Sequence, residues 1–210
     1  MPSEVKLVIC ESLKEEARAA LSLAGLDDIE IVTFSPIEYR PWNDEGTLGG
    51  SVSDHLSPDD AICVVDVGCH RGHLHLPENY RFVHTTASAN TAEFLAGRVV
   101  AEQLFAEGAY VIVPGWAKRW RSYLHANGVD PEETRRRYES FSRLVMLQVI
   151  PGSDGAHPLR ELSNYLHLEP EIVPVGLEML SLRLVNGILQ ACLMRTADHH
   201  GGLPREIQPL

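Results

Sequence analysis

The sequence predicts an α/β fold, a doubly wound and mostly parallel sheet with helices on both faces. Short apolar segments alternate with helical segments along the chain, and this alternation favours parallel βαβ units. The chain has 210 residues, of which 44% are hydrophobic and 22% are charged, as expected for a packed globular protein. This length is enough for a single α/β domain over 1–210, or for two Rossmann-like lobes, 1–90 and 91–210, around a cleft.

The first half of the chain contains four predicted strands, at residues 6–10, 29–34, 61–67 and 81–85. Ser12 and Glu15 have the spacing of a capping box, so we expect a helix to begin at Ser12 and to end near Gly25. Residues 35–60 are rich in Pro, Gly, Ser and Asp. They predict an irregular segment with one short helix near VSDHL.

In the second half, one long helix is expected from Ser88 or Asn90 to Gly108, and another begins at Asp130 and Pro131. Further strands are predicted at 109–115, 143–150 and 171–175, and further helices at 116–128, 157–168 and 176–195. In the last of these helices apolar residues recur every three or four positions. They are Leu177, Leu180, Leu184, Ile188 and Cys192.

Charge and composition exclude several classes of protein. The formal net charge is −11, which argues against nucleic-acid or anionic-membrane binding, because phosphate recognition depends on Lys and Arg. No apolar run is long enough for a transmembrane helix. The N-terminal segment MPSEVKLVIC lacks the basic start and apolar stretch of a signal peptide, so we expect a cytoplasmic protein.

The four cysteines are expected to be thiols, because a reducing compartment disfavours disulfides. Cys63 lies within an apolar strand and Cys192 on a helical apolar stripe, so both are interpreted as core residues. Cys10 and Cys69 instead follow predicted strands.

Several polar residues follow the strands. Ligands of open parallel sheets bind beyond the carboxyl ends of the strands. If the strands are parallel, one rim collects the candidate ligand-binding residues Glu11, Asp66, Gly68, Gly72 and Trp116, and the candidate metal ligands Cys10, Cys69, His70, His73, His75 and His84.

A zinc-like transition metal is the sharpest hypothesis for this rim. Zinc accepts thiolate and imidazole ligands, and a catalytic site combines three protein ligands with an open position. Cys10, Cys69 and His84 would supply such a set, with His70, His73 or His75 as alternates. The competing interpretation is a surface loop with exposed histidines.

Other chemistries are weaker. Gly68 and Gly72 could let backbone N–H groups hold an anion, but the segment matches neither GxGxxG nor a Walker loop. A reactive low-pKa thiolate at Cys69 is a further alternative.

Trp116 and Trp120 share a helix face. Core packing is the favoured interpretation, and the alternative is an aromatic wall beside Arg119 or Arg121.

The order of these segments resembles an uncharacterised bacterial and archaeal family, a domain of unknown function. Its members carry a Cys after the first strand, a YGxCGxG-like turn, an HDC-containing helix start and a TPGW motif. Cys10, DVGCHRG around Cys69 and VPGW at Trp116 match three of these. Ala89, Asn90 and Thr91 stand where the family has HDC.

The resemblance implies a function. Family members occur beside corrinoid methyltransferase genes, and a related branch is similar to N-terminal input domains of sensor histidine kinases. The resemblance therefore implies a sensory domain for a small-molecule or metal ligand, with a histidine kinase output domain as partner. The alternative is a zinc-type metalloenzyme of methyl transfer or hydrolysis, with Glu11 or Asp66 as proton acceptor. A third interpretation is an interaction module that forms a homodimer through its last helix.

Overall fold

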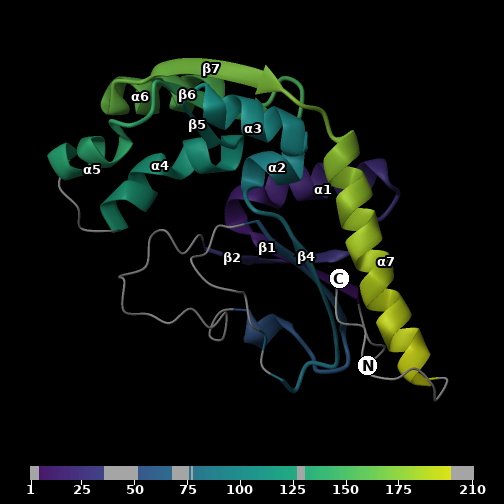
Figure 1. The fold of residues 1–210 in the computed structure, drawn as a ribbon. Helices are drawn as coiled ribbons and strands as arrows, with labels where there is room; N and C mark the ends of the chain where they lie inside the picture. Colours follow the sequence, from purple (N-terminus) through teal and green to yellow (C-terminus); the bar gives the residue numbers. More distant parts are fainter. Residues whose placement is uncertain (1–4, 36–51, 68–75, 77, 127–130, 200–210) are drawn as a thin grey trace.

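The computed structural model describes residues 5–35, 52–67, 76, 78–126 and 131–199, and these residues form the predicted α/β fold with two parallel sheets (Figure 1). The first sheet has the strand order β2-β1-β3-β4 and the second has the order β5-β6-β7. All paired strands are parallel. The strands are β1 Val5–Cys10, β2 Glu30–Phe34, β3 Ala61–Asp66, β4 Phe82–Ala87, β5 Ala109–Ile112, β6 Arg143–Gln148 and β7 Glu169–Pro174.

Helices cover both sheets. The α-helices are α1 Lys14–Leu23, α2 Thr91–Ala96, α3 Arg98–Ala106, α4 Pro114–Ala126, α5 Pro131–Tyr138, α6 Ala156–Leu166 and α7 Glu178–His199, and the 3-10 helices are η1 Glu11–Leu13 and η3 Ser53–His55. Helices α4 and α6 pack together on the second sheet, where α2 and α3 also contact β5 or β6. The four residues 144–147 of β6 are all buried, as expected for a parallel strand covered on both faces.

The prediction of one long helix after Asn90 is wrong, because this segment forms two helices, α2 and α3. The Asn90 side chain caps α2 as predicted, with Oδ1 accepting a hydrogen bond from the Glu93 N–H at 2.8 Å. Gly97 then adopts φ 83° and ψ 162° between α2 and α3. This is not a helical conformation, and its positive φ favours glycine.

The capping box predicted at Ser12 is also wrong. Residues 11–13 form the 3-10 turn η1, and α1 begins at Lys14 without a side-chain cap. The Ser12 hydroxyl lies instead 3.1 Å from the Cys10 sulfur atom. The contact with Cys10 and the tight turn thus replace the expected cap.

Helix α7, from the last part of the described chain, packs on the first sheet, whose strands all end before residue 90. It packs against β1, β3 and β4 and against α1, and Figure 1 shows it along the side of this sheet. Its stripe residues Leu180, Leu184 and Ile188 are buried as predicted. The largest buried cluster includes residues of both sheets. None of the described helices is long and apolar enough to cross a membrane.

Candidate ligand site at the strand ends

Cys10 ends β1 on one particular face of the first sheet. Side chains of a strand alternate between faces, so Val8 and Cys10 point to one side and Leu7 and Ile9 to the other. The buried clusters reflect this, with Val8 and Cys10 in the smaller cluster and Leu7 and Ile9 in the larger one. The Cys10 side chain is fully buried, and its sulfur atom contacts the Ser12 hydroxyl.

Asp66 lies on the same face as Cys10. Val8 pairs with Val64 in the register of β1 and β3, so the residues two positions further along each strand also share a face. The Ser88 N–H donates a hydrogen bond to the Asp66 carbonyl oxygen at 2.9 Å. The Ser88 hydroxyl is buried and has no hydrogen-bond partner among the described residues. Asp66 pairs with Ala87 in the register of β3 and β4, so Ser88 follows on the opposite face of the sheet. We call Cys10 and Asp66 the strand-end rim.

Helix α4 of the second sheet closes directly over the end of β1. Gly115 has no side chain because a Cβ atom there would overlap the Ser12 carbonyl oxygen. The Lys118 ammonium group lies 2.8 Å from the Glu15 carboxylate, and Arg119 forms an ion pair with Glu11. The carboxyl ends of β1 and β5 therefore meet at one junction.

Polar groups at this junction influence one another. Burial raises the pKa of Tyr123 to about 12, and the nearby Glu11 carboxylate adds to the rise. The hydrogen bond with Glu11 raises the pKa of Arg119. Glu11 is 29% exposed and Arg119 is 48% exposed, so this pair lies at the solvent edge. The junction thus holds a protonated phenol and an accessible ion pair beside the buried Cys10 thiol.

His84 lies on the opposite face of the sheet from Cys10. His84 of β4 pairs with Cys63 of β3, and Cys63 pairs with Leu7 of β1. The three side chains therefore share one face of the sheet, the face that α7 covers. A Cβ atom on Gly187 of α7 would lie 2.6 Å from the Cys63 sulfur and 3.7 Å from His84 Cδ2. Burial lowers the pKa of His84. A metal set that combines Cys10 with His84 is therefore incompatible with this sheet.

The other predicted ligands of the loop lie outside the described residues. These are Gly68, Cys69, His70, Gly72, His73 and His75. Within the described ranges no three His, Cys, Asp or Glu side chains are grouped so as to hold a metal ion. The rim itself contributes one sulfur and one carboxylate, from Cys10 and Asp66.

Trp116, Trp120 and Cys63 are core residues, as the sequence favoured. Trp116 and Trp120 are 7% and 6% exposed. The Trp116 ring lies edge-on to Tyr110 at 6.0 Å between centroids and 6.0 Å from Tyr123, so it supports the junction instead of lining an open wall. Burial raises the pKa of the Cys63 thiol to about 11.

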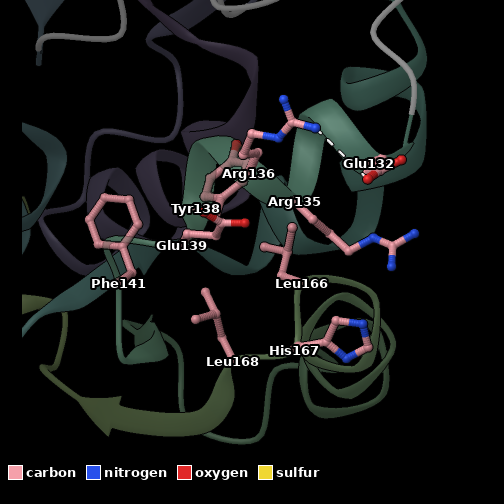
Figure 2. Close-up of a pocket in the computed structure, with 9 residues that line it drawn as sticks. All are labelled: Glu132, Arg135, Arg136, Tyr138, Glu139, Phe141, Leu166, His167 and Leu168. Carbon is pink, nitrogen blue, oxygen red and sulfur yellow. Dashed lines mark ion pairs between the residues drawn. The ribbon is translucent and has the colours of Figure 1, made fainter.

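A hollow of about 370 Å³ lies elsewhere, beside the second sheet (Figure 2). It is lined by α5 and by the segment that joins α6 to β7, including Arg135, Arg136 and His167. Phe141 and Leu168, which precede β6 and β7, place it at the amino ends of these strands. Ligands of parallel sheets bind at the carboxyl ends, so this hollow is not the predicted rim.

The sequence predicted part of the rim and of the junction. Glu11 and Asp66 were candidate residues, whereas Arg119 and Arg121 were named only as alternatives beside an aromatic wall. The structure separates the two arginines, because Arg121 pairs with Glu161 at 2.9 Å whereas Arg119 pairs with Glu11. The sequence did not predict that Tyr123 lies at this junction. Its spacing of four from Arg119 was the available signal, since such residues share a helix face.

The chain was compared with protein-family models, curated proteins and solved structures. No family model, no curated protein and no solved structure matches this chain.

Proposed function

We propose that this chain is a ligand-binding module of the sensory input type, and that it binds a zinc-type metal ion at the strand-end rim. The observation that carries the proposal is the shared face of Cys10 and Asp66 at the carboxyl edge of the first sheet. A thiolate and a carboxylate are both zinc ligands. The carboxyl edge is where parallel sheets bind ligands.

The sequence supports further ligands close to this rim. Cys69 and His70 follow Asp66 by three and four positions, and thiolate and imidazole would complete a tetrahedral set.

A sensory role requires that binding at the rim be communicated to another part of the chain. Helix α4 connects the two sheets at the junction beside the rim, where Arg119 forms an ion pair with Glu11. Helix α7 runs along the first sheet, and its last turns reach the opposite edge, where Asp198 accepts a hydrogen bond from Arg81 at 2.5 Å. We propose that α7 carries the signal from the rim toward an output domain of the histidine kinase type.

Zinc-dependent stabilisation tests this proposal. Ligand that binds only the folded state stabilises it by about 2.7 kcal/mol at roughly 100 times Kd. We expect zinc to raise the thermal midpoint of the wild-type protein, and to raise it much less in Cys10→Ser and Asp66→Asn. Each variant is compared with its own metal-free sample, so a lower baseline stability does not affect the result.

Cys192→Ser is the matched control, because Cys192 lies on α7 and packs against the larger core cluster. It removes a thiol away from the rim and should keep the full response to zinc. A wild-type midpoint that zinc leaves unchanged, or an unaltered response in both rim variants, would contradict the proposal.

A further inference from the structure

Helix α7 is apolar on two opposite faces, and the first sheet covers only one of them. Leu180, Leu184, Ile188 and Ala191 are buried against the core. The other face carries a row of residues that we call the outer seam. It consists of Met179, Leu182, Asn186, Leu189 and Leu193.

The outer seam is exposed along its whole length. Met179, Leu182, Leu189 and Leu193 are 40%, 67%, 54% and 58% exposed, and Asn186 is also exposed. Large exposed apolar surfaces mark interaction sites, and four of the five seam residues are large apolar side chains. In Figure 1, α7 lies at the side of the molecule.

We propose that the outer seam joins two copies of this chain as a parallel, in-register two-helix coiled coil. Its residues follow one another at alternating spacings of three and four, which is the a and d pattern of a heptad. With Asn186 at an a position, Leu182 and Leu189 fall at d. Leucine at d favours parallel dimers, and a single asparagine at a selects the two-stranded, in-register state.

Charge complementarity supports the parallel orientation. In this register Glu178 occupies a g position and Arg183 the e position of the following heptad. Parallel coiled coils bring g of one helix beside the following e of its partner, where opposite charges form salt bridges. The exposed Glu178 of one copy would thus meet Arg183 of the other. An antiparallel pair would place Asn186 against leucine instead.

The helix is already ordered before two copies meet. Gly187 lets α7 approach β3 and β4 closely, since a Cβ atom there would lie 2.5 Å from the Thr86 hydroxyl oxygen. The outer seam covers about two heptads, from Met179 to Leu193, and an isolated helix of ~12–15 residues is marginal in water because ordering it is unfavourable. Here the packing on the sheet has already ordered α7, which lowers the entropic cost of association.

Sedimentation of the complete chain tests the interface. At about 100 μM the wild-type protein should be a dimer, and Leu182→Asp with Leu189→Asp should weaken association at least about tenfold. Val99→Asp is the matched control, because Val99 is 78% exposed on α3 and lies outside α7. Circular dichroism should show that all variants remain folded, since the substituted side chains are exposed.

Cross-linking tests the orientation. Met179 lies in the first turn of α7, so Met179→Cys places two thiols side by side only in a parallel, in-register dimer. Mild oxidation should link this variant into a covalent dimer to a much greater extent than wild type or Val99→Cys, neither of which has a thiol in the outer seam. A monomeric wild type, a dimer that survives both Asp substitutions, or a sedimenting dimer of Met179→Cys without the cross-link would each overturn the proposal.

Discussion

Glu16 is a carboxyl group buried beside the junction between α1 and α4. Its side chain is 2% exposed, and Oε2 has no hydrogen-bond partner among the described residues. Burial raises the pKa of Glu16 from 4.5 to about 7, and the neighbouring Glu15 carboxylate adds to this, while its own backbone N–H and Lys118 oppose it. The folded protein therefore holds a proton that the unfolded chain releases at lower pH.

The contribution of Glu16 to the stability of the protein should fall as pH rises from about 4.5 to about 7. In this window the unfolded chain loses the Glu16 proton and the folded protein keeps it, which disfavours folding by about 3 kcal/mol at pH 7 and above, at about 1.4 kcal/mol per pKa unit. The expected result is that Glu16→Gln gains stability relative to wild type as pH increases through this window. Urea unfolding at pH 4.5 and 8 measures it.

The exposed Glu139 provides the control, since Glu139→Gln should follow the wild-type pH dependence. If wild type and Glu16→Gln change in parallel with pH, Glu16 titrates normally in the folded protein and this account of the buried carboxyl is wrong.

At the scale of elements, the position of α7 depends on the close approach at Gly187. A Cβ atom there would lie 2.5 Å from Thr86 Oγ1 and 2.6 Å from the Cys63 sulfur. Neither contact is possible unless the helix or the two side chains shift, because real Cβ atoms do not approach neighbours so closely. The small residue is therefore required by the packing of α7 against β3 and β4.

Gly187→Ala should destabilise the protein by about 1–3 kcal/mol, the usual effect of overpacking a core. The better helix propensity of alanine offsets only about 1 kcal/mol. Gln190→Ala, an exposed position on the same helix, should have little effect. Urea unfolding of both variants checks this, and a Gly187→Ala variant as stable as wild type would mean that α7 does not pack as closely as the structure shows.

The sequence predicted most elements and the Asn90 cap of α2, but not the break at Gly97 or the start of α1. Apolar runs identified β1, β3 and β6 most clearly, because these strands are buried along most of their length. The break at Gly97 was missed, because an isolated glycine is compatible with a continuing helical pattern. The Ser12 cap was predicted wrongly because the hydroxyl contacts Cys10, a residue outside the capping pattern.

At the scale of the whole molecule, the sequence predicted which residues end strands but not the faces on which they lie. Period two separates Cys10 from Ile9 within one strand. Comparing Cys10 with His84 requires the register of three strands, in which His84 stands beside Cys63. The packing of α7 on the first sheet is a long-range contact. The spacing of its apolar residues predicts a buried helix face, but it does not predict which element covers that face.

The central claim is that the strand-end rim binds a zinc-type metal ion through Cys10. The most direct test is the metal content of protein prepared without chelator or affinity tag, loaded with zinc and desalted. We predict about one zinc ion per chain in wild type and in Cys192→Ser, and a loss of most of it in Cys10→Ser. A wild-type protein that retains no zinc, or a Cys10→Ser protein that retains as much as wild type, would contradict the claim.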